Sequence, residues 1–309
     1  MLVLAPVTTI LYRQSKAVHS TLRTLSLAEG EVRHHQRDLL DFTDDYPMSM
    51  IRTDWKFSET DREFFRQQGY YTYNRFLTDE ALASCEREID LMLSELQPGR
   101  DPANIISPHH IKRWIWDLAN EPRILDMMES QIGENLVLWS THMLCKPPGS
   151  GMPIPWHQDA PYWNVGGPFP AGLWIAFDAM DEDNGAMAVL PGWHQKGTLP
   201  IDTRENVLFN QMIDPQRLPP DVDSVKHQYR MPAGGMAMHD TMIPHSSTAN
   251  QSPRWRRVLV LRYMSATAEM GEKMYEDYRD GSPMPREFFL VRGEDIDQRG
   301  LPRVPAAFA

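Results

Sequence analysis

From about residue 135 onward, the chain is built of short apolar runs separated by turns. The runs occupy residues 136–139, 173–177, 186–190, 236–238 and 258–261, and Gly, Pro or Asn-Gly stands between them. Short strands divided by such turn residues are typical of a jelly-roll-like barrel. Proline makes up 25 of the 309 residues, above the usual share of about 5%, and this fits long loops at a barrel mouth.

The stretch before this region has helical signals. Thr60 and Glu63 have the spacing of a capping box, and Gly69 is a typical helix end, so we expect a helix that begins at Thr60 and places Phe64 and Phe65 on a core. Residues 69–73 then read as a short strand.

Two further helices are predicted. Thr78 can cap one that runs to about residue 96, and another covers about 122–132, with a proline in its first turn and Gly133 at its end. Helices followed by strands predict an α+β architecture in which the helices pack outside the barrel.

We divide the chain as follows. Residues 1–57 form an N-terminal arm or extension, through which a homo-oligomer could assemble. Residues 58–309 form one domain, with helices over about 58–133, the barrel over about 135–265 and a charged tail over 266–309. Within it, residues 196–229 are polar and rich in proline, and we expect a long insertion that covers the site. In the tail, Met274, Tyr275 and Tyr278 lie at helical spacing.

Composition limits the partners of the protein. The net charge of −11 and the absence of a basic stripe argue against nucleic acid and against a membrane surface. No stretch reaches the roughly 20 apolar residues that a membrane span needs. Cys85 and Cys145 are too few for a disulfide framework, which fits a reducing, cytoplasmic compartment. The apolar N-terminus lacks a basic region and is interrupted by Pro6, so we expect no signal peptide.

The candidate chemistry centres on the segment 152–159, which ends in His157, Gln158 and Asp159. His157 and Asp159 are two positions apart and therefore point to the same side of an extended backbone. His245 would complete a set of two histidines and one carboxylate. Such a set occupies one face of a metal and leaves the opposite positions open, as in non-haem Fe(II) oxygenases.

An arginine follows at the start of the next apolar run. If that run is a strand, Arg256 and Val258 share a face, and an inward-facing arginine needs an anionic partner. Arg254 and Arg257 are the alternatives, although alternation would turn Arg257 away from the site.

Other candidate residues have plainer explanations beside the functional ones. Gln158 fits a supporting hydrogen bond as well as a substrate contact, and three neighbouring aromatic residues could wall a pocket or belong to the core: Trp156, Tyr162 and Trp163. His194 fits a structural role, His239 is a weak candidate ligand, and the pair His109 and His110, which looks exposed, receives no role.

The segment from about 140 to 263 resembles the phytanoyl-CoA dioxygenase family of Fe(II)/2-oxoglutarate oxygenases. The matching pieces, in order, are Lys-Pro-Pro-Gly at 146–149, Trp-His-Gln-Asp at 156–159, Leu-Trp-Ile-Ala at 173–176, the run 184–194, and the block from His245 to Arg256. Trp193 departs from the pattern, which has a small residue there.

The resemblance implies a double-stranded β-helix, a jelly-roll or cupin-like barrel, with iron on His157, Asp159 and His245 and 2-oxoglutarate on Arg256. By position in the same motifs, three more residues would line the cosubstrate: His142, Trp174 and Ser247. Related halogenases lack the carboxylate that Asp159 supplies, so oxygen insertion or desaturation is favoured over halogenation.

The resulting hypothesis is a dioxygenase that uses Fe(II), 2-oxoglutarate and O2 to hydroxylate a small organic metabolite or natural-product intermediate, with release of succinate and CO2. The acidic balance and the lack of a basic cluster in the sequence argue against a CoA ester. The same site could instead perform desaturation, epimerisation or ring formation. An alternative of another class is a non-catalytic metal-binding barrel.

Overall fold

The computed structural model describes residues 49–163, 165, 172–202 and 212–309. The predicted arm therefore lies largely outside the described residues, and its role in an oligomer stays a prediction. The described helices are α1 (Glu59–Gln68), α2 (Asp79–Ser94), α3 (Arg113–Ala119), α4 (Pro122–Ile132) and α5 (Val222–Val225).

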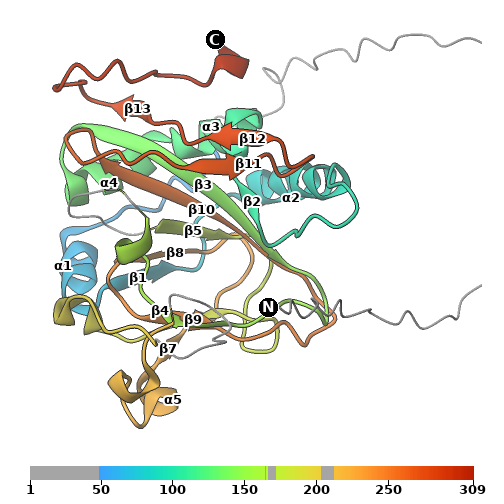
Figure 1. Cartoon of the computed structure of the whole chain (residues 1–309), viewed down its shortest axis with the longest axis vertical. Coiled ribbons are helices and arrows are strands. Elements are labelled where there is room, and N and C mark those ends of the chain that lie inside the picture. The colour runs from blue at the N-terminus through green and yellow to red at the C-terminus, as the bar shows by residue number, and fades with distance from the viewer. Residues whose placement is uncertain (1–48, 164, 166–171, 203–211) are drawn as a thin grey trace, which may run out of the picture. The chain divides into compact units, whose positions relative to one another are not determined.

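Most strands form two antiparallel sheets (Figure 1). The larger contains, in spatial order, β1 (Tyr70–Tyr73), β8 (Met236–His239), β5 (Gly172–Ala176), β10 (Arg256–Ser265), β3 (Leu136–Lys146) and β13 (Phe289–Arg292), and β2 (Ile105–Ile106) pairs with β3. The smaller contains β4 (Ile154–His157), β9 (His245–Ser247), β6 (Met187–Val189) and β7 (His227–Gln228). The antiparallel pattern expected from the short apolar runs is thus present.

Strand alternation divides the core into two layers. On β10, Leu259 and Leu261 pack in a cluster with the buried faces of α1 to α4, such as Ile89 of α2. Val258 and Val260 point to the opposite side and pack with Val189 of the smaller sheet. The helices therefore cover the outer face of the larger sheet, and the inner face looks toward the smaller sheet.

Local signals placed some helix ends correctly. Thr78 accepts a hydrogen bond from the backbone N–H of Ala81 at the start of α2, and Gly133 follows α4 directly. Gly69 ends α1 with a positive φ of 75°, the left-handed conformation that glycine adopts most easily.

The start of α1 was predicted wrongly. Its cap is Ser58, whose hydroxyl accepts from the Asp61 N–H while the Asp61 carboxylate accepts from the Ser58 N–H. The expected box at Thr60 and Glu63 lies two residues too far along. Phe65 is buried as expected, but Phe64 is 42% exposed.

In the tail, Met274 and Tyr275, two of the residues at helical spacing, lie in a strand and not in a helix. Residues 274–276 form β11 (Met274–Glu276), which pairs with β12 (Pro283–Pro285) in a separate hairpin. The backbone N–H of Arg286 donates to the Lys273 carbonyl at 2.8 Å and extends that pairing by one step. In the described part of the chain, no helix combines the length and the apolar character that a membrane crossing needs.

Candidate metal and cosubstrate site

The two strands that carry the predicted ligands lie side by side. β4 pairs with β9, and the register sets His157 opposite His245. Their imidazole rings are 4.0 Å apart between centroids. Asp159 follows β4 in a loop that is fixed because its backbone N–H and that of Ala160 both donate to the Thr241 carbonyl, at 3.0 and 3.1 Å.

This arrangement brings the three side chains together. The Asp159 Oδ1 lies 3.6 Å from the His157 Nε2 and 3.8 Å from the His245 Nε2. One ligand atom from each residue lies within 4.8 Å of the others, and no second such group occurs among the described residues. Each histidine Nδ1 faces a backbone carbonyl, Pro155 at 2.9 Å or Ile243 at 3.1 Å, which can only accept. The Nδ1 atoms are therefore the donors, and the Nε2 lone pairs face Asp159.

The protonation states suit a metal. Burial, followed by the neighbouring His157, lowers the pKa of His245 well below its ordinary value, so the imidazole is neutral. Burial alone would raise the pKa of Asp159, but His245 and His157 outweigh it and hold that pKa far below its usual range. A neutral imidazole on His245 and an ionised carboxylate on Asp159 are the forms in which these side chains bind a divalent transition metal.

A cavity of about 200 Å³ extends from these ligands between the two sheets. The larger sheet contributes His142, Trp174 and Arg256 to its lining, and the smaller contributes Ser247, so all four residues expected around the cosubstrate line one cavity. On β10 and its neighbours, Val260 pairs with both His142 and Trp174, which explains why they share this face.

The three candidate arginines have different surroundings. Arg257 is on the outer face, bound to Asp178 at 2.9 Å, and Arg254 is held by Asp181 at 2.7 Å near the surface. Arg256 is 2% exposed, and among the described residues its Nε has no hydrogen-bond partner. A buried guanidinium with unused donors fits a carboxylate that arrives with a ligand.

Lys146 was not singled out from the sequence. It is 3% exposed, pairs with Arg256 in the β3–β10 register, and donates from Nζ to the Ser247 hydroxyl at 2.8 Å. Burial, and secondarily Arg256, lowers its pKa to about 7. No signal in the sequence indicated that Lys146 lies beside Arg256, because this depends on the register between β3 and β10.

The remaining candidates have structural surroundings. Gln158 is buried and bonds to backbone atoms of Gly197, Leu199 and Met242, so it supports the loops around the site. His194 bonds to the Arg66 carbonyl at 3.1 Å. His239 lies behind His245 with a centroid distance of 4.9 Å, outside the ligand group.

Three further predictions concerned the pair His109 and His110, the aromatic residues near the ligands, and the insertion at 196–229. His109 is fully buried, and His110 is mostly so, which corrects the prediction of an exposed pair. The ring centroids of Trp163 and Trp139 are 5.0 Å apart, and both residues line a neighbouring cavity. Trp156 does not line the cavity at the ligands. The Tyr162 side chain and residues 203–211 of the expected insertion lie outside the described residues.

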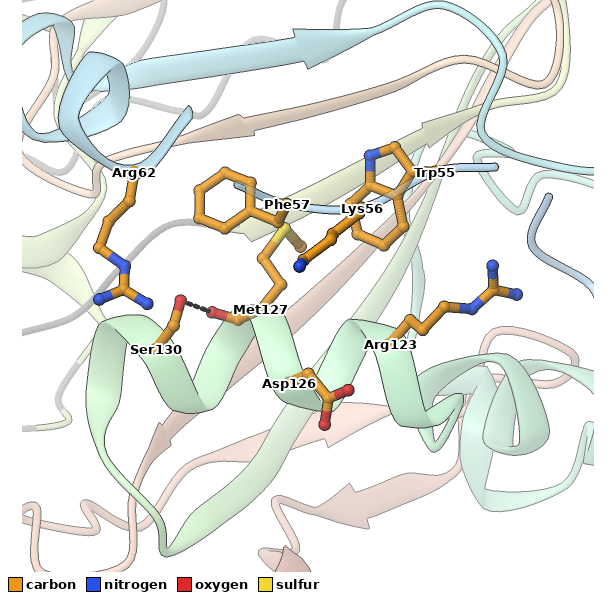
Figure 2. Close-up of a pocket in the computed structure, with 8 residues that line it drawn as sticks. All are labelled: Trp55, Lys56, Phe57, Arg62, Arg123, Asp126, Met127 and Ser130. Atoms are coloured by element: carbon orange, nitrogen blue, oxygen red, sulfur yellow. Dashed lines mark hydrogen bonds between the residues drawn. The ribbon is translucent and has the colours of Figure 1, made fainter. Parts of the chain in front are cut away.

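Another hollow, of about 170 Å³, lies between residues 55–57 and α4 (Figure 2). Two of its polar side chains already bond to backbone carbonyls. Arg123 donates to the carbonyls of Ile51 and Arg52, and the Ser130 hydroxyl donates to the Met127 carbonyl at 2.6 Å. This hollow lies between the N-terminal segment and α4, and among the described residues no cluster of three metal-ligating side chains occurs there.

The chain resembles known proteins over residues 65–258, which include the smaller sheet of the site and most strands of the larger one. The sequence model of phytanoyl-CoA dioxygenase (PhyH) matches residues 65–258. A probable alpha-ketoglutarate-dependent hypophosphite dioxygenase of Stutzerimonas stutzeri is 31% identical over 175 residues, 56% of this chain and 61% of that protein. The peroxisomal phytanoyl-CoA dioxygenase of Bos taurus is 22% identical over 237 residues, 66% of this chain and 68% of that protein. The chain thus matches about two thirds or less of these relatives.

Solved structures agree on the fold. The apo form of ThoJ, described as a non-heme monooxygenase, superposes with a TM-score of 0.59 at 25% identity, over 79% of this chain and 88% of that one. EvdO2 from Micromonospora carbonacea var. aurantiaca, complexed with 2-oxoglutarate, superposes with a TM-score of 0.58 at 23% identity, over 72% and 96%. With the family match over more than half its length, this chain belongs to the phytanoyl-CoA dioxygenase family of Fe(II)/2-oxoglutarate-dependent oxygenases.

Proposed function

We propose that this protein is an Fe(II)- and 2-oxoglutarate-dependent oxygenase that hydroxylates a small organic molecule and releases succinate and CO2. One observation carries the proposal: a His-Asp-His group lines the same cavity between the sheets as a buried arginine, Arg256, that has no carboxylate partner among the described residues. We infer also that these sheets are the two halves of a double-stranded β-helix, and that the protein acts in the cytoplasm.

The residues have separate roles in this proposal. His157, Asp159 and His245 would hold Fe(II), and Arg256 with Ser247 would bind the distal carboxylate of 2-oxoglutarate. When bound, iron with this cosubstrate supplies the oxidation of an unactivated C–H bond by O2, coupled to decarboxylation of the cosubstrate. His142 and Trp174 would pack along the cosubstrate and limit its movement.

The protein contributes positioning and exclusion of water. The carbonyls of Pro155 and Ile243 fix both imidazole rings, so the three ligand atoms converge on one point. Lys146 holds the Ser247 hydroxyl in place. The apolar wall formed by Leu144, Ile154 and Met187 keeps the cavity poor in water.

The reaction type is tested by the product. A substrate screen coupled to succinate release should identify a turned-over compound, and mass spectrometry should find one added oxygen atom. A product lighter by two hydrogens would indicate desaturation or ring formation, and a product of unchanged mass would indicate epimerisation. Each of these would replace hydroxylation.

A further inference from the structure

A second cavity, of about 210 Å³, adjoins the one at the metal ligands. The two are contiguous because His142 and Arg262 line both. Arg262 lies on β10, six positions after Arg256 and on the same inner face, so one row of side chains passes from the cosubstrate end to this second cavity. A molecule in the second cavity would reach toward the metal ligands past these two residues.

The second cavity is cationic. Its lining contains Arg262, Lys273 and Arg286, and none of the described residues that line it is a carboxylate. Burial lowers the pKa of Lys273, and Arg286 and Arg262 lower it further because their charges face it. Burial likewise lowers the pKa of Arg262, and the charge of Asp159 partly offsets this. Gathering like charges in a half-enclosed space costs free energy unless an anion neutralises them.

Hydrogen bonds of the fold fix the positions of Lys273 and Arg286 in this cluster. Lys273 and Arg286 flank the β11–β12 hairpin and are joined through their backbones. Arg286 is 8% exposed, and its Nε and Nη2 donate to the Tyr275 hydroxyl at 3.1 and 2.9 Å, while Nη1 donates to the Gly271 carbonyl at 3.1 Å. These bonds hold the guanidinium at the cavity wall.

Arg262 is the member with unused donors. Its Nε is buried and has no hydrogen-bond partner among the described residues. The guanidinium carbon lies 4.9 Å from the ring centroid of Trp163 and 5.9 Å from that of Trp139. Trp139 also lies 5.1 Å from the Arg286 guanidinium, so indole faces and cations alternate around the cavity.

We propose that this second cavity is the substrate's anchoring subsite, and that the substrate carries an oxyanion, a carboxylate or a phospho group, which Arg262, Lys273 and Arg286 bind while its adjoining carbon skeleton reaches toward His157, Asp159 and His245. The proposal rests on the oxygenase function above, since the skeleton is then the part that is oxidised. Trp139 and Trp163 would hold the apolar part next to the oxyanion. The sequence shows no basic cluster because the three cations lie on separate segments, and they meet only in the folded chain.

Calorimetric titration tests this without turnover. The full-length protein is held anaerobically with Fe(II) and saturating 2-oxoglutarate, so that Arg256 is occupied, and is titrated with phenylphosphonate, benzoate and benzyl alcohol. We expect at least one anion to bind about tenfold or more tightly than the neutral alcohol, because hydrogen bonds to charged groups are strong in partly buried sites. Tighter phenylphosphonate identifies a phospho group, and tighter benzoate a carboxylate.

Variants assign the binding to the cluster. Arg286→Met and Lys273→Met should each weaken the anion about tenfold or more, and Arg286→Lys should recover part of the loss. Arg279→Met is the matched control, since Arg279 lies on the same hairpin but pairs with Asp277 at 2.7 Å on the surface. Lys273 is exposed, and its replacement should not disturb folding. The Lys273→Met variant therefore remains informative if Arg286→Met fails to fold.

The outcomes separate the two proposals. Equal binding of benzyl alcohol, no binding of either anion, or unchanged affinity in both methionine variants would overturn the anion subsite. Anion binding that depends on Lys273 and Arg286 in a protein that never forms succinate would instead overturn the oxygenase function and keep the subsite as a binding site.

Discussion

Arg256 and Arg262 lie on the same inner face of β10, with two valines between them, at opposite ends of the space between the sheets. At about 3.3 Å per residue, six residues separate their backbones by roughly 20 Å. The strand thus places one cation at the proposed cosubstrate end and one near the proposed substrate end. Leu259 and Leu261, which alternate with this row, anchor the strand to the helices.

The metal ligands give the first prediction. His157→Ala or His245→Ala should abolish iron binding and turnover, because the remaining groups cannot hold the facial geometry. His239→Ala is the matched control: it removes a buried histidine beside His245 that lies outside the ligand group, and iron should remain. Iron is measured anaerobically on each variant. Full iron occupancy and activity in His245→Ala would disprove the assignment.

The second prediction compares neighbouring arginines. Arg256→Ala should weaken 2-oxoglutarate by on the order of 2–5 kcal/mol, roughly thirty-fold or more, as for the loss of a buried charge pair. Arg257→Ala should leave this affinity nearly unchanged, because Arg257 faces outward and pairs with Asp178. Titration of the absorption band of the Fe(II) complex with 2-oxoglutarate measures both. If Arg257→Ala is the variant that loses 2-oxoglutarate affinity, Arg257 and not Arg256 faces the cavity, and the assignment of the inner face of β10 is wrong.

The third prediction concerns pH. The pKa of Lys146 is lowered to about 7, so the ammonium is charged below this pH and neutral above it. Because the charged form adds to the attraction of Arg256 for a dicarboxylate, 2-oxoglutarate affinity should fall as pH rises through about 7. A difference of one pKa unit between the free and bound protein corresponds to about tenfold in affinity.

Lys146→Met isolates this effect. The variant keeps an unbranched side chain of nearly the same length and removes the titrating group, so its affinity should be low and independent of pH across this range. Lys226→Met, at an exposed ion pair with Asp223, is the control and should behave as the wild type does. The dissociation constant is followed from pH 6.5 to 8.5 with iron content checked at each point. The same pH step in Lys146→Met would assign the titration to another group.

The sequence predicted features whose signals are local. Pro122 and Gly133 bound α4 correctly because helix ends are set by their own residues. Thr60 was chosen over Ser58 at α1 because both are capping residues with an acidic residue three positions later. α3 was missed because it has only seven residues, and Arg113 and Asp117 are the only polar ones, so its amphipathic period is too short to recognise.

Features assembled from distant segments were less accessible. The triad could be predicted because its members sit in motifs with a recognisable order. The cluster of Arg262, Lys273 and Arg286 could not, since it depends on where the β11–β12 hairpin packs against β10. The charges of Lys146 and Arg256 become neighbours only through the strand register.

The last prediction decides whether the protein is a catalyst or a metal-binding barrel, and it depends on Asp159. An oxygenase with its ligands intact should slowly convert 2-oxoglutarate to succinate without its true substrate, because its cavity already brings together iron, cosubstrate and oxygen. Asp159→Ala removes the carboxylate that lies within 4 Å of both imidazoles and leaves Arg256 in place. We expect Fe(II)-dependent succinate from the wild type and strongly reduced succinate from Asp159→Ala, measured by mass spectrometry. Equal amounts from both proteins, at the level of free iron in buffer, would make the non-catalytic barrel the better description.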